Sequence, residues 1–132
     1  MARLDHINIQ TAKLAETVAF YRDVLELRAG DPPPPLDPAA VQWMFDGDGQ
    51  AIFHLSGPGA LVAVGDINVG PDTGAVHHVA LSCTGHDAML EKLDRMGLHH
   101  RVNHVVAIDL KQIFVRDPNG VLLELNYRKG NH

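Results

Sequence analysis

The 132-residue sequence has one cysteine, Cys83, no run of basic residues and no long apolar segment. A single cysteine cannot form an internal disulfide, which is typical of a protein in a reducing cytoplasm. A net charge of −5 makes nucleic acids and anionic membranes poor candidate partners. Because an alternating segment begins almost at once, neither a signal peptide nor a membrane span is expected.

Histidine is the unusual residue, with nine in so short a chain. The length and the 45% hydrophobic content indicate a single globular domain over residues 1–132 with a substantial core.

The order of predicted elements is similar in the two halves of the chain. Periodicity and turn signals predict a strand, a helix and then two or three strands in each half. In the first half these are strand 3–9, helix 12–25, a proline-rich loop over 29–40, and strands 41–46 and 51–56. In the second half they are strand 76–83, helix 85–97, a segment rich in His and Val, and strands 112–117 and 121–127. We therefore predict module one over about 1–57, a linker over about 58–75 and module two over about 76–128.

Superposing the halves places polar residues at equivalent positions. His6 falls on His78 at an offset of 72, and His54 falls on Glu124 at an offset of 70. If the two halves pair about a pseudo-twofold axis, these four side chains can converge. Each histidine alone is more often a packed or surface residue. Three imidazoles and one carboxylate together suit one divalent transition metal ion, such as Zn, Fe, Ni, Mn or Co.

Four segments carry a family resemblance: LDHINI, AFYRDVLEL, HHVALS and FVRDPNGVLLEL. They resemble the vicinal oxygen chelate superfamily, which contains glyoxalases, bleomycin and fosfomycin resistance proteins and extradiol dioxygenases. The resemblance implies an α+β fold, in which two βαβββ modules form a cup-shaped mixed sheet with the helices outside. It also implies the metal ligands His6, His54, His78 and Glu124, a small-molecule substrate and a homodimer.

The resemblance favours a glyoxalase-like, metal-dependent lyase or isomerase acting on a small carbonyl compound with vicinal oxygens. Glu124 would be the catalytic base and His54 a second acid or base. Bacterial-type glyoxalase I usually has Glu at the position of His54, which leaves other reactions open. The first alternative is an Fe(II) extradiol-type dioxygenase using His6, His78 and Glu124, although Phe114 stands where that branch usually has Tyr. The second is a drug- or metabolite-binding protein without turnover.

Several further residues are candidates for lining the site. Met44 and Phe114 each precede the last-strand polar residue by ten positions, and either a substrate-binding or a core role fits them. Asn8 and Asn126 share strand faces with His6 and Glu124 and are expected to reach the substrate or support the ligands. Three other histidines, His99, His100 and His104, are better explained by a solvated loop or edge strand than by a second, His-rich metal-binding segment. We expect His77 to point away from His78, toward a rim or interface.

Overall fold

The computed structural model describes residues 1, 3–58, 60, 76–130 and 132. The chain divides into two compact units, Met1–Asp72 and Thr73–His132, each with its own helix and sheet. The predicted linker over about 58–75 lies outside the described residues except for Pro58 and Ala60. The single domain of 132 residues stays a prediction.

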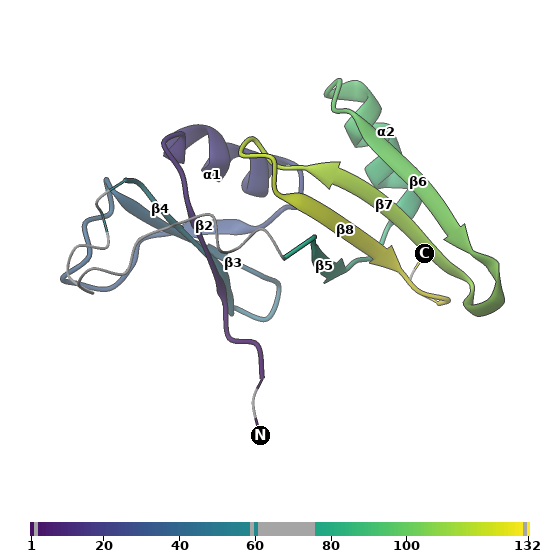
Figure 1. Ribbon diagram of the computed structural model, residues 1–132, viewed down its shortest axis with the longest axis horizontal. Helices are drawn as coiled ribbons and strands as arrows, with labels where there is room; N and C mark the ends of the chain where they lie inside the picture. The colour runs from purple at the N-terminus through teal and green to yellow at the C-terminus, as the bar shows by residue number, and fades with distance from the viewer. Residues whose placement is uncertain (2, 59, 61–75, 131) are drawn as a thin grey trace. The chain divides into compact units, whose positions relative to one another are not determined.

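The first unit has the element order βαβββ (Figure 1). The elements are β1 Ile7–Gln10, α1 Leu14–Asp23, β2 Arg28–Gly30, β3 Val41–Phe45 and β4 Ala51–Ser56. The sheet order is β1-β4-β3-β2, with β1 parallel to β4 and the other neighbours antiparallel. The first strand of the unit therefore lies beside the last.

The second unit repeats this arrangement. Its elements are β5 Val79–Ser82, α2 His86–Arg95, β6 His100–Val105, the 3₁₀ turn η3 Val106–Ile108, β7 Leu110–Arg116 and β8 Leu122–Tyr127. The sheet order is β5-β8-β7-β6, and again the first strand is parallel to the last. The predicted α+β fold with two βαβββ modules is confirmed.

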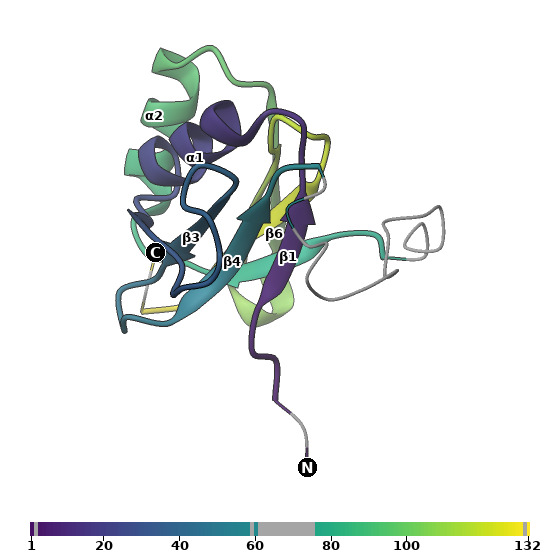
Figure 2. The ribbon, with the colours of Figure 1, turned by 90° about the vertical axis from the view of Figure 1, so that its left-hand side faces the viewer.

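Helix α1 covers one face of the first sheet because its buried residues follow helical spacing (Figure 2). The ring of Tyr21 lies 4.6 Å from that of Phe53 on β4, and both side chains are buried. In β4, Phe53 and Leu55 point into this core. Strand alternation therefore puts His54 on the opposite face.

The second sheet separates apolar and polar residues in the same way. Ile113 and Val115 on β7 and Leu123 and Leu125 on β8 are buried, as is Leu93 on α2. The residues between them form the opposite face: Gln112, Phe114 and Arg116 on β7, and Leu122, Glu124 and Asn126 on β8. This second face carries the chemically functional side chains.

Three local predictions need correction. Strands β1 and β5 begin one residue after His6 and His78, so each histidine precedes its strand instead of lying on it. The helix expected over 12–25 is shorter at both ends. Strand β2 begins before the prolines, in a stretch partly assigned to the loop. Its pairing with β3 is supported by Arg28, which lies 4.4 Å over the Phe45 ring.

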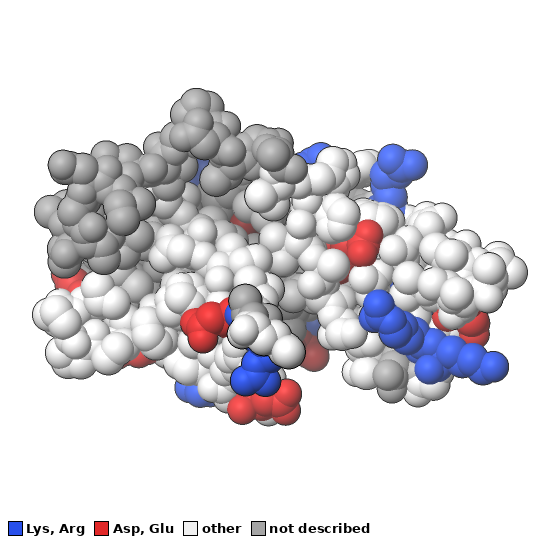
Figure 3. Space-filling view, turned by 60° about the horizontal axis from the view of Figure 1, so that its bottom comes forward, with Lys and Arg blue, Asp and Glu red and all other residues white. Residues whose placement is uncertain are grey.

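None of the helices in the described ranges is both long and apolar enough to cross a membrane. On the face shown in Figure 3, most of the described surface is uncharged, and acidic and basic groups both occur on it.

Candidate functional site

The first unit brings His6 and His54 into contact. Strand β1 runs parallel to β4 with Asn8 opposite His54, which places His6, just before β1, on the same face. The two imidazole rings are stacked, with centroids 3.7 Å apart and planes 12° from parallel. Both predicted ligands of the first half are therefore adjacent.

Trp43 completes this stack. It lies directly opposite His54 on β3, with ring centroids 4.0 Å apart and planes 9° from parallel. Phe114 lies opposite Glu124 in the same way. The alignment of the two halves by sequence matched Met44, and not Trp43, with Phe114. In the structure, Ile52 is an extra residue that the pairing of β3 with β4 skips, so Trp43 is the residue opposite His54. Met44 instead points into the core and is fully buried, and a substrate-binding role for it stays a prediction.

The surroundings of His54 favour its neutral form. Burial and the neighbouring His6 lower the pKa of the His54 imidazole, and a neutral imidazole is the form that binds a metal. His6 has a carboxylate neighbour, since its Nδ1 lies 2.6 Å from Asp5 Oδ2. When His6 donates Nδ1–H to that oxygen, the Nε2 lone pair is left for a metal, which is a common arrangement around metal-binding histidines.

The second unit brings His78 and Glu124 together. His78 precedes β5, and Glu124 lies on its parallel neighbour β8, opposite Ala80. The distance from His78 Nε2 to Glu124 Oε1 is 3.7 Å. The side chain of His77 does contact His78, with 2.9 Å between their Nδ1 atoms, so the expectation that it points away from His78 is wrong.

A chain of side-chain amides crosses the second sheet and ends at Glu124. Asn103 on β6 donates to Gln112 Oε1 at 2.8 Å, Gln112 donates to Asn126 Oδ1 at 3.1 Å, and Asn126 donates to Glu124 Oε2 at 2.9 Å. An ionised carboxylate only accepts hydrogen bonds, so it fixes the direction of every amide in the chain. The chain therefore holds Oε2 of Glu124 and leaves Oε1 facing His78.

Replacing Gln112 with leucine should lower the free energy of unfolding by about 1–3 kcal/mol, because it leaves the acceptor of the buried Asn126 without its donor. Chemical denaturation measures the change. Gln42→Leu is the matched control: the Gln42 amide also makes two hydrogen bonds, donating to the Asp31 carboxylate and the Pro38 carbonyl, but these bonds are exposed. We expect a loss of about 0.5 kcal/mol there. Equal losses in the two variants would contradict a structural role for the amide chain.

The remaining candidates are placed as follows. Asn8 accepts a hydrogen bond from the buried Ser56 hydroxyl at 3.0 Å. His99, His100 and His104 lie at or next to β6, an edge strand, and His104 is bonded to Asp109 at 2.9 Å. Within the described part of each unit, no group of three or more His, Cys, Asp or Glu side chains could hold a metal ion.

Trp43, Asp5, Gln112 and Asn103 were not identified from the sequence. Trp43 could have been found by aligning the sequences of the two hairpins at their turns. Asp46 and Asp117 both accept from the second and fourth backbone N–H groups after them. That alignment has an offset of 71, which places Trp43 on Phe114.

Comparison with protein families then identifies the fold family. Residues 3–125 match the model of the Glyoxalase/Bleomycin resistance protein/Dioxygenase superfamily. The chain belongs to this superfamily. The resemblance predicted from the sequence is thereby confirmed. Comparison with curated proteins gave no match.

Solved structures with the same fold cover nearly the whole chain. A protein from Bacillus anthracis, described as of the glyoxalase family, has 18% identity and a TM-score of 0.71, covering 98% of this chain and 97% of its own. The fosfomycin resistance protein FosX of Listeria monocytogenes has 15% identity and a TM-score of 0.68, covering 98% and 94%. Lactoylglutathione lyase of Agrobacterium tumefaciens has 17% identity and a TM-score of 0.63, covering 92% and 90%. At these identities, the likeness establishes the fold.

Proposed function

We propose that this protein is a glyoxalase-like, metal-dependent lyase or isomerase with His6, His54, His78 and Glu124 as metal ligands. The observation that carries the proposal is the matched pairing in the two units. In each, one residue just before the first strand meets one residue on the last strand, His6 with His54 and His78 with Glu124. Supporting this, a FosX variant from Listeria monocytogenes was solved with Mn(II) and a dihydroxypropylphosphonic acid.

The donor set fits a divalent transition metal. His54 is held toward its neutral form, Asp5 contacts Nδ1 of His6, and Asn126 donates to one oxygen of Glu124 while the other faces His78. Imidazole nitrogen and carboxylate oxygen are the ligands such ions accept, but they do not select one metal. When bound, the ion would supply Lewis-acid stabilisation of an enolate.

The residues around this set would move the proton and shape the site. Glu124 takes a proton from the hydroxyl-bearing carbon beside a carbonyl group and returns it to the carbonyl carbon, while the hydroxyl proton passes to the former carbonyl oxygen, so the substrate is isomerised without net loss of a proton. Its side chain is 16% exposed, which leaves it accessible to a small molecule. Trp43 and Phe114 lie opposite His54 and Glu124 and would exclude water from the reacting carbons. Asn8 and Asn126 would hold polar groups of the substrate in place.

The same proposal includes a homodimer, because superfamily proteins often dimerise, and a cytoplasmic location, because Cys83 is the only cysteine. The dioxygenase alternative gains no support from the residue opposite Glu124, since Phe114 has no hydroxyl group.

The activity is tested with the hemithioacetal of methylglyoxal and a small thiol, assayed under nitrogen with metal-loaded protein. We expect product to form without oxygen and to stop when the metal is chelated. Oxygen consumption with catechols, together with inactivity under nitrogen, would contradict the lyase and favour the dioxygenase.

A further inference from the structure

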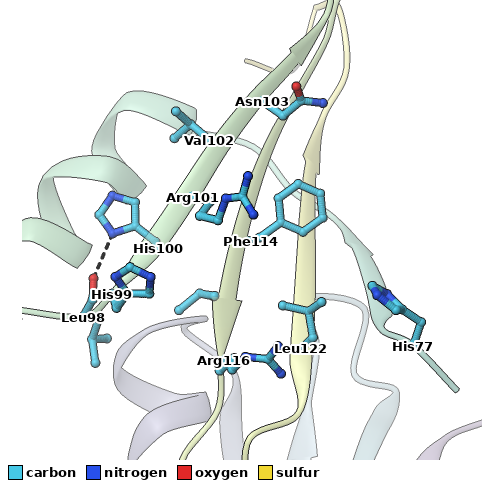
Figure 4. Close-up of a pocket in the computed structure, with 11 residues that line it drawn as sticks. His77, Leu98, His99, His100, Arg101, Val102, Asn103, Phe114, Arg116 and Leu122 are labelled. Atoms are coloured by element: carbon cyan, nitrogen blue, oxygen red, sulfur yellow. Dashed lines mark hydrogen bonds between the residues drawn. The ribbon is translucent and has the colours of Figure 1, made fainter. Parts of the chain in front are cut away.

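The second unit contains a cavity of about 720 Å³ that is lined mainly by residues of β6 and β7 (Figure 4). Strands β6, β7 and β8, the segment just before β6 and the segment containing His77 supply its lining residues. Cavities of about 300–1,000 Å³ are typical of small-molecule sites. The volume therefore suits a ligand of that class.

The charge of the cavity is opposite to that of the chain. Among the described residues, its lining includes Arg101, Arg116 and three histidines but no Asp or Glu, although the chain carries a net charge of −5. Asp94 contacts the lining residue His100 at 3.7 Å, but this carboxylate is mostly exposed. The cavity therefore favours an anionic ligand.

Within the described part of the chain, no carboxylate neutralises either arginine. No salt bridge joins either guanidinium to another described residue. Arg116 donates to the carbonyl of Gly120 at 2.8 Å, which uses one N–H group and anchors the side chain. A guanidinium has five N–H donors arranged to match a carboxylate or phosphate. Both arginines therefore have donors left for a ligand.

Apolar side chains lie between these cations and Glu124. Arg101 is opposite Phe114, and Phe114 is opposite Glu124. Figure 4 shows the Arg101 guanidinium beside the Phe114 ring. Adjacent strands are about 4.8 Å apart, so the row from Arg101 to Glu124 spans about 10 Å of backbone. Leu122 is opposite Arg116 and extends the apolar surface.

We propose that this cavity binds the anionic end of the substrate through Arg101 and Arg116, with the apolar part on Phe114 and the reacting oxygens toward Glu124. The inference rests on the proposed function for the orientation of the substrate, but the anion subsite itself needs no metal. Its ligand is a small acid with an aromatic or short aliphatic body. The acidic group is a carboxylate or a phosphorus oxyanion, which a guanidinium binds in the same way.

Three probes of similar shape test the proposal by titration calorimetry: 4-methylbenzoate, 4-methylphenylphosphonate and the neutral 4-methylbenzamide. The full-length protein is titrated as purified and after removal of metal by a chelator. We expect at least one acid to bind at least tenfold more tightly than the amide in both forms. The tighter of the two acids identifies the anionic group.

Variants assign the binding to the cavity. Arg101→Met should weaken binding of the preferred acid at least tenfold. Arg101→Lys should bind more tightly than Arg101→Met but less tightly than the unaltered protein, because lysine has the positive charge but lacks the planar guanidinium group. Arg95→Met, at the exposed end of α2, should leave binding unchanged. Circular dichroism checks that each variant is folded. Equal binding of acid and amide, or equal effects of Arg95→Met and Arg101→Met, would overturn the proposal.

Metal uptake separates this inference from the proposed function. Acid binding through Arg101 in a protein that takes up no metal would support the anion subsite and overturn the metal-dependent reaction. Normal metal uptake without acid binding would overturn the anion subsite alone.

Discussion

Glu124→Gln is expected to reduce turnover of the methylglyoxal hemithioacetal by about a thousandfold, within the range for loss of a general base. Glutamine has nearly the same size as glutamate, and its carbonyl oxygen can still accept the hydrogen bond from Asn126 that Glu124 Oε2 now accepts. The amide chain across β6, β7 and β8 should therefore survive. What disappears is the negative charge and the ability to accept a proton from carbon.

Turnover is measured at saturating metal, so that a weakened metal site is not mistaken for a lost base. Glu91→Gln is the matched control, because Glu91 is exposed on α2 and has no place in the proposed site. Its turnover should equal that of the unaltered protein. If Glu124→Gln retains more than about a tenth of normal turnover, Glu124 is not the base.

His54→Ala is expected to weaken the binding of Zn²⁺ at least a hundredfold. Removing a residue that only supports a ligand typically costs about 10–100-fold in metal affinity, and His54 is proposed as a ligand itself. The ring lies between His6 and Trp43, so the substitution also removes the contact that holds His6 in place. A competition titration with a chromophoric chelator measures the change.

His77→Ala is the comparison variant for this measurement. His77 contacts the Nδ1 atom of His78 at 2.9 Å, so it would act on the metal only through His78. We expect its loss to weaken Zn²⁺ binding by about tenfold. Thermal unfolding of both metal-free variants separates metal affinity from general destabilisation. Small, equal changes in affinity would contradict the ligand assignment.

Much of the fold could be predicted because the hydrophobic pattern repeats in the two halves. Strand β4 has the predicted bounds, since alternation and a turn define both of its ends. Strand β2 was missed because it has three residues and leads into a proline-rich loop. Such a short edge strand has too few residues to show a period of two.

The candidate site was predictable in part, for a different reason. Equivalent positions in a repeat indicate which residues correspond, and this comparison selected the four residues by matching His6 with His78 and His54 with Glu124. An alignment of the two halves does not show which residues of neighbouring strands lie opposite each other. The skipped residue Ile52 shifts the hairpin and brings Trp43 beside His54. The amide chain depends on the same kind of information, because its members come from three strands whose pairing must be known.

The most direct test of the proposed metal-dependent function is the metal content of the full-length protein purified without chelators. Elemental analysis by mass spectrometry should find one divalent transition metal ion per chain. The content should fall in His54→Ala and remain close to that of the unaltered protein in the control His99→Ala. A protein without bound transition metal, which also fails to take up Zn, Fe, Ni, Mn or Co when these are supplied, would contradict the account.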